Sequence, residues 1–190
     1  MSKTVFLDRD GTLNREVGYL KSPDQLELLP GVSNALRQLH DKGYRLVITT
    51  NQSGIARGLY SERDLAAVHA RLHELVDGLP LAYLHCPHHP EVTDGDPRYL
   101  MDCSCRKPKA GLLHQACAML RSFGVTLEES VVIGDSARDL LMAQGLPVTK
   151  ILVASGNPIA AQQQQLMAAG CIADHEAADL AAAVSWLAQQ

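Results

Sequence analysis

The sequence has few aromatic residues and no excess of positive charge. Its 190 residues include only two phenylalanines, one tryptophan and five tyrosines, and the formal net charge at neutral pH is −4. A surface that binds nucleic acid needs a basic stripe and aromatic rings on which bases can stack. Because the chain is poor in both, we expect no nucleic-acid partner.

Long hydrophobic runs are also missing. No apolar stretch approaches the ~20 residues of a membrane-spanning helix. The apolar run at residues 4–7 is too short for a secretory signal and meets acidic residues at once. We therefore expect a cytoplasmic protein with no membrane partner. With 46% hydrophobic and 20% charged residues, the composition is that of a globular protein. The length suits one domain over residues 1–190, and we expect a monomer.

Cysteine is sparse, and its number is odd. Of the five cysteines, three lie within residues 86–105, which favours metal ligation over a disulfide framework. Two closely spaced pairs bracket a polar loop, and three thiolates with one imidazole are a common ligand set for a tetrahedral structural zinc ion. The candidate ligands are Cys86, Cys103 and Cys105 with His88, and His85 and His89 are the rival imidazoles. The other interpretation is a surface loop in which these residues occur by coincidence.

Apolar runs and helical patterns alternate along the whole chain. Strands are expected over residues 4–7, 44–50, 81–85, 130–135 and 150–155. Helices are expected over residues 31–43, after a capping box formed by Ser61 and Asp64, over roughly 110–123, after residue 135, and twice near the C-terminus. This alternation predicts an α/β fold, a doubly wound and mainly parallel sheet with helices on both faces.

Residues able to do chemistry stand where these strands end. They are Asp8, Asp10, Thr50, Asn51, Lys107 and Asp135. Ligands of such sheets bind at the carboxyl ends of the strands, so these side chains can converge on one point. Asp8 and Asp10 would repel each other unless a cation lies between them. The alternative is that both belong to an ordinary turn that includes Gly11.

The motifs LDRDGTLN, TNQSGIARG, CRKP and GDSARD, in this order, resemble the haloacid dehalogenase superfamily of phosphotransferases. The resemblance covers essentially the whole chain. Within the superfamily it points to the small zinc-containing branch without a cap domain, whose members act on heptose bisphosphates or on histidinol phosphate. It implies a Rossmann-like fold of haloacid dehalogenase type, with a zinc-bound loop at residues 86–107 and an open site.

The resemblance also implies a role for each residue at the strand ends. Asp8 matches the nucleophile that forms an aspartyl-phosphate, and Asp10 matches the general acid/base. Mg²⁺ would be held by Asp8, the Asp10 carbonyl and Asp135. Thr50 and Lys107 would grip the phosphoryl group.

Arg106 would be a further donor to that phosphoryl group. Asp139 is either a positioning acid or an ordinary acid in the first turn of a helix.

For the zinc loop, the resemblance selects His88 over two other nearby histidines, His85 and His89. The zinc would be structural and would place Arg106 and Lys107 directly after the last ligand.

The expected substrate is a small sugar phosphate. The favoured reaction is removal of the 7-phosphate from a heptose 1,7-bisphosphate; the alternatives are hydrolysis of histidinol phosphate and a zinc-stabilised binding module without catalysis. The candidate substrate-binding residues are Glu16, Gly18, Tyr19, Thr50, Asn51, Gln52, Ser53, Arg106, Lys107 and Ser136. Ser136 departs from the Lys that some heptose-bisphosphate phosphatases carry at this position.

Overall fold

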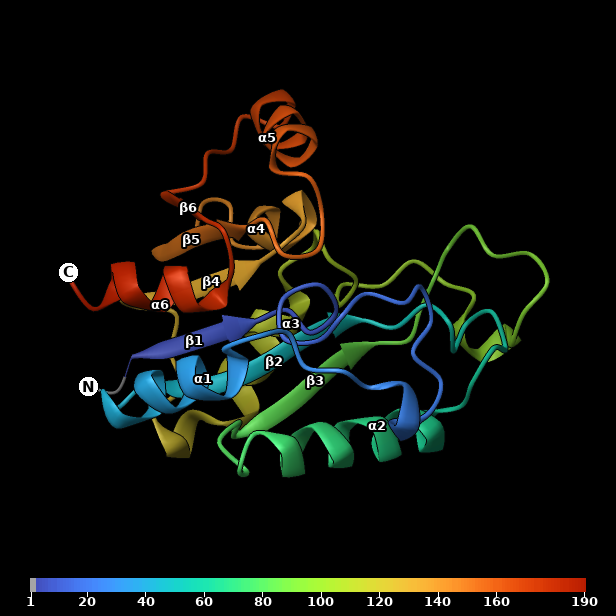
Figure 1. The fold of residues 1–190 in the computed structure, drawn as a ribbon. Coiled ribbons are helices and arrows are strands. Elements are labelled where there is room, and N and C mark those ends of the chain that lie inside the picture. The colour runs from blue at the N-terminus through green and yellow to red at the C-terminus, as the bar shows by residue number, and fades with distance from the viewer. Residues whose placement is uncertain (1–2) are drawn as a thin grey trace.

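The computed structural model describes residues 3–190, so the first two residues of the predicted domain lie outside the described range. A six-stranded sheet in the order β3-β2-β1-β4-β5-β6 forms its centre (Figure 1). All five strand pairings are parallel. The strands are β1 (Thr4–Leu7), β2 (Arg45–Asn51), β3 (Ala82–Cys86), β4 (Ser130–Gly134), β5 (Val148–Val153) and β6 (His175–Ala177).

Helices connect the strands and cover both faces of the sheet. They are α1 (Val32–Asp41), α2 (Glu62–Leu75), α3 (Gly111–Met119), α4 (Ala137–Leu141), α5 (Ile159–Ala168) and α6 (Leu180–Leu187). Short 3₁₀ helices lie at η1 (Pro23–Gln25), η2 (Pro97–Tyr99) and η3 (Arg121–Phe123). In the described range, residues 3–190, no helix is long and apolar enough to cross a membrane.

The core is divided into two layers because side chains alternate along each strand. Val5 and Leu7 pack with α1 and α6 on one face of the sheet. Phe6, between them in the sequence, packs with α3 on the other face. Both faces of β1 are therefore buried, as is usual for a parallel sheet covered by helices.

The predicted α/β class and the parallel sheet are confirmed, with two corrections. The sheet has a sixth strand, β6, where only helices were expected. Its three residues, His175 to Ala177, carry no apolar run, and the strand forms by pairing with β5 at the sheet edge. The helix expected over 110–123 ends at Met119 and continues as η3, which stops at Gly124 in the left-handed conformation that glycine favours.

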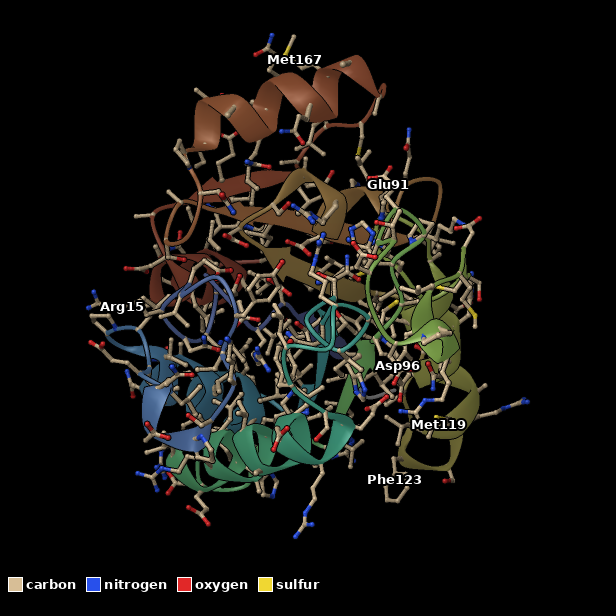
Figure 2. All side chains as sticks on the ribbon, turned by 90° about the vertical axis from the view of Figure 1, so that its right-hand side faces the viewer. Arg15, Glu91, Asp96, Met119, Phe123 and Met167 are labelled. Carbon is tan, nitrogen blue, oxygen red and sulfur yellow. The ribbon has the colours of Figure 1, made fainter. Side chains whose placement is uncertain are left out.

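Parallel strands bring all their carboxyl ends to one edge, and Figure 2 looks onto that edge. The chain order reverses between β1 and β4, which pair through Leu7 and Ile133. Binding sites of such sheets lie at this switch point. Arg15, from the loop after β1, and Glu91, from the loop after β3, lie on opposite sides of the view. Within residues 3–190, no cap domain is inserted in the loops that follow the strands at this edge.

Candidate active site

A lysine ammonium group lies at the centre of the switch point. Lys107 is buried, and its Nζ donates to Asp8 Oδ1 at 2.7 Å and to Asp139 Oδ1 at 2.6 Å. It also donates to the Thr49 carbonyl at 2.8 Å. Burial alone would lower the pKa of Lys107, but the charges of Asp139 and Asp8 raise it above its usual range. Lys107 is therefore a fixed cation that links the Asp8 and Asp139 carboxylates and the Thr49 carbonyl.

Three buried carboxyl groups surround this single ammonium group. Oxygens of Asp8, Asp135 and Asp139 all lie within 4.8 Å of one another. Burial, followed by the charge of Asp139, raises the pKa of Asp8 well above its usual range and that of Asp135 to about 7. One lysine does not balance three carboxylates, so the cluster favours an additional cation.

The surroundings of Asp135 show which oxygens are available to such a cation. Asn157, in the loop after β5, donates to Asp135 Oδ2 at 2.6 Å. A Cβ atom at Gly11 or Gly156 would collide with the Asp135 carboxyl group, so both backbones approach it closely. Asp139 is already committed, because one oxygen binds Lys107 and the other accepts from the Ser136 amide at 3.0 Å.

The donor set fits Mg²⁺, a hard cation that binds one or two carboxylates together with water and phosphate oxygens. Asp8 and Asp135 are the carboxylates able to hold it. The side chain of the predicted ligand Asp10 is bound to other partners. The Asp10 group assigned to the metal in the sequence analysis is its backbone carbonyl.

The Asp10 carboxylate is held by side-chain donors. Arg9 donates from one nitrogen to both oxygens, at 2.9 and 2.7 Å. Asn14 donates to Oδ1 and Gln52 to Oδ2, each at 2.9 Å. Burial alone would raise the pKa of Asp10, but the Arg9 charge and these hydrogen bonds together lower it. These donors fix the Asp10 side chain in place and, without substrate, favour its deprotonated form.

Side chains at the end of β2 form hydrogen bonds that hold Lys107 and Asp10 in place. Asn51 binds the Lys107 backbone with both side-chain atoms, accepting from its amide at 3.0 Å and donating to its carbonyl at 3.1 Å. Buried Gln52 donates to Thr50 Oγ1 at 2.8 Å and accepts from Tyr60 at 2.6 Å. Asn51 thus holds the Lys107 backbone and Gln52 holds the Asp10 carboxylate, while their role as substrate ligands stays a prediction.

An open cavity lies above this cluster. Its lining includes the predicted residues Asp8, Asp10, Glu16, Gly18, Tyr19, Thr50, Asn51, Gln52, Ser53, Lys107, Asp135 and Ser136. The Glu16 carboxylate accepts from the Gly18 amide, and burial followed by the charge of Asp10 raises the pKa of Glu16.

Among the predicted substrate-binding residues, Arg106 lies outside the cavity lining, whereas Arg138, which was not predicted, lies inside it. Arg106 is half-buried and donates to the His88 carbonyl at 3.2 Å. Arg138 lines the cavity, and its Nε donates to Ser136 Oγ at 3.1 Å. Burial, followed by the nearby positive charges of Arg138 and Arg57, lowers the pKa of Arg106. Arg57 lines an adjoining cavity, and its charge, like that of Arg138, acts on Arg106.

The four predicted zinc ligands form a second cluster beyond the strand ends. Cys103 Sγ lies 3.5 Å from Cys86 Sγ and 3.4 Å from Cys105 Sγ. His88 Nδ1 lies 3.4 Å from Cys105 Sγ and 3.8 Å from Cys86 Sγ. Ligands about 2.0–2.3 Å from a tetrahedral zinc ion are roughly 3.5–3.8 Å apart, so the set fits Zn²⁺.

The two other histidines have different partners. His85 Nε2 lies 2.6 Å from a carboxylate oxygen of Glu62 on α2. His89 Nδ1 accepts from the Glu91 amide at 3.2 Å. Neither belongs to the sulfur cluster, whereas His88 does.

The chain is similar to known phosphatases over most of its length. A family model described as polynucleotide kinase 3 phosphatase matches residues 3–187. The D-glycero-beta-D-manno-heptose-1,7-bisphosphate 7-phosphatase of Haemophilus ducreyi is 43% identical over 168 residues, which are 86% of this chain and 89% of the relative. The enzyme of the same name from Pasteurella multocida is 42% identical over 167 residues, 84% of this chain and 85% of the relative.

Among solved structures, the D,D-heptose 1,7-bisphosphate phosphatase from B. bronchiseptica, complexed with magnesium and phosphate, has a TM-score of 0.78 and 33% identity. The match covers 98% of each chain.

Proposed function

We propose that this chain, which belongs to the polynucleotide kinase 3 phosphatase family, removes the 7-phosphate from D-glycero-β-D-manno-heptose 1,7-bisphosphate. The predicted resemblance to haloacid dehalogenase phosphatases is confirmed, and the chain is a phosphatase. The observation that carries the proposal is the placement of Asp8 between Lys107 and Asp135 at the switch point, in a chain so similar to enzymes of that name.

The first half of the reaction transfers the phosphoryl group to the protein. An Asp8 oxygen forms a bond to phosphorus while the bond from phosphorus to the sugar oxygen breaks. The electron pair of that bond goes to the sugar oxygen, which takes a proton from Asp10. Mg²⁺, when bound, offsets the negative charges of the carboxylates and the phosphate. Lys107 and Thr50 hold the phosphoryl oxygens.

The second half restores the protein. A water oxygen bonds to phosphorus, and its proton passes to the Asp10 carboxylate, which now acts as a base. The bond from phosphorus to Asp8 breaks, and its electron pair returns to the Asp8 carboxylate. Inorganic phosphate leaves, and Asp10 carries the proton needed for the next cycle.

The arginines of the rim supply a place for the second phosphate. Arg138 lines the catalytic cavity, Arg57 lines an adjoining one, and Tyr19 lines both. The charge of Arg106 lies near those of Arg138 and Arg57. Like charges gathered in this way repel, and an anionic ligand relieves the repulsion. This supports a substrate with two phosphates rather than a cationic one such as histidinol phosphate.

The family's description names a polynucleotide, but the low aromatic content and the net charge of −4 favour a small substrate. We further propose that Zn²⁺ bound to the loop of residues 86–107 has a structural role, because its four protein ligands leave no open coordination position.

The deciding experiment compares kcat/KM for the heptose bisphosphate and for histidinol phosphate on one Mg²⁺-loaded preparation. We expect at least a tenfold preference for the bisphosphate, about 1.4 kcal/mol of differential transition-state binding. A tenfold preference for histidinol phosphate would refute the heptose assignment and leave the phosphatase chemistry standing. Turnover of neither compound would refute the proposed function.

A further inference from the structure

Arg9 lies between the two catalytic aspartates in the sequence, yet the reaction described above gives it no part. Its side chain is only 1% exposed. Two of its nitrogens, Nε and one terminal nitrogen, donate to Asp10, the former at 3.1 Å. The remaining terminal nitrogen lies 3.2 Å from Nε2 of His69. A buried guanidinium group therefore joins the general acid/base to a helix outside the cavity.

His69 lies in the middle of α2, which packs along β3 at the edge of the sheet (Figure 1). A guanidinium group has only donors, so His69 Nε2 must accept, and the ring proton resides on Nδ1. Burial, followed by the charge of Arg9, lowers the pKa of His69 to about 3, which keeps the ring neutral. The ring packs against Tyr83, with centroids 5.1 Å apart.

We propose that His69 is a positioning residue: by accepting a hydrogen bond from Arg9, it holds the guanidinium group against Asp10 and keeps the proton-transferring carboxyl group in place. Gln52 and Asn14 fix the same carboxylate through other hydrogen bonds. This inference rests on the proposed function, because it assigns His69 a part in the same reaction.

The chemistry gives this role a distinctive signature. A sugar alkoxide is a poor leaving group and needs the proton of Asp10 as it departs, whereas 4-nitrophenolate leaves without one. Displacement of Asp10 should therefore slow cleavage of the sugar ester far more than cleavage of 4-nitrophenyl phosphate. A general loss of structure would slow both esters alike.

The experiment measures kcat/KM for both esters, because this ratio covers the steps up to departure of the leaving group. His69→Phe keeps a ring against Tyr83 but has no acceptor, and His69→Leu is a second such variant should the first fail to fold. His69→Gln returns an acceptor oxygen. The matched control is His73→Phe, one turn along α2, where the histidine is exposed and has no contact with Arg9.

For His69→Phe and His69→Leu we expect kcat/KM for the heptose bisphosphate to fall at least about tenfold, and that for 4-nitrophenyl phosphate to fall less than about threefold. His69→Gln and His73→Phe should stay near wild type on both. Equal losses on the two esters, or no loss on either, would overturn the positioning role. A wild-type protein inactive on both esters would refute the proposed function itself.

Discussion

The switch point and the zinc loop approach the same cavity but are held in place by different forces. β1 and β4, which carry Asp8 and Asp135 at their ends, are buried along their full length, and burying one such apolar side chain stabilises by about 1.5–3 kcal/mol. Between residues 88 and 104, by contrast, no side chain is fully buried. We therefore expect a metal ion bound by the four-residue cluster to hold that loop where a core cannot.

From this comparison we expect the catalytic groups to depend on the fold and the loop to depend on the proposed zinc ion. The backbone of the loop has few fixed attachments to the rest of the chain. The Asp96 amide donates to the Ala56 carbonyl at 3.0 Å, and Gly95 approaches that carbonyl so closely that a Cβ would collide with it. Substitutions at the switch point should therefore abolish catalysis, and substitutions in the loop should reduce it.

The largest effect is expected for Asp8→Asn, which removes the proposed nucleophile from the end of β1. An amide neither attacks phosphorus nor balances Lys107, so kcat should fall by at least about 10³-fold. Turnover is measured as phosphate release with saturating Mg²⁺. Asp41→Asn, on the exposed end of α1, serves as the control and should keep wild-type activity. If Asp8→Asn kept most of its activity, the aspartyl-phosphate route would be wrong.

Lys107→Met should have the next largest effect. It removes the cation between Asp8 and Asp139 and a donor to the transferring oxygens, so kcat should fall by about 10²–10³-fold. Lys109→Met, two residues later and paired with exposed Asp102, is the matched control. Comparable turnover in the two variants would show that the buried ammonium group is dispensable.

Much of the switch point could be predicted from the sequence, because its residues follow recognisable strands. Asp8 and Asp135 each end an apolar run, and the parallel alternation brings such ends together. Asp139 allowed two interpretations, and its contacts fit both: it accepts from Lys107 and also from the Ser136 amide at the start of α4.

Other features depend on packing that no local pattern reveals. Arg138 has the sequence signature of any exposed helix residue, and only the fold brings the start of α4, with Arg138, to the cavity. The sequence analysis assigned nothing to His69, which is buried on α2 and whose contact with Arg9 spans sixty positions in the chain. The edge strand β6 arises from pairing with β5 rather than from apolar residues of its own.

A moderate effect is expected for Cys103→Ala, which breaks the ligand set. The protein should lose its zinc, measured by elemental analysis as one ion per wild-type chain, and kcat/KM should fall by roughly tenfold through misplaced side chains. Amide exchange should rise in the loop and stay unchanged in β1 and β4. Cys117→Ala, on α3 outside the cluster, is the control. Zinc-free wild-type protein with full activity would contradict this prediction.

The smallest effect, and the sharpest test of the comparison, concerns two arginines that reach the rim from the two regions. Arg106 comes from the zinc loop and binds the His88 carbonyl, whereas Arg138 comes from α4 behind the switch point. Replacing either with Gln should raise KM for the heptose bisphosphate by roughly threefold to tenfold while leaving kcat nearly unchanged, since each contributes one charge to the second phosphate.

In a Cys103→Ala background, Arg106→Gln should have almost no further effect, because the loop that positions Arg106 has lost its order. Arg138→Gln should keep its full effect there, since α4 is packed against the sheet. A double-mutant cycle measures both couplings, and equal coupling of the two arginines to Cys103 would show that the loop and the switch point are not held independently.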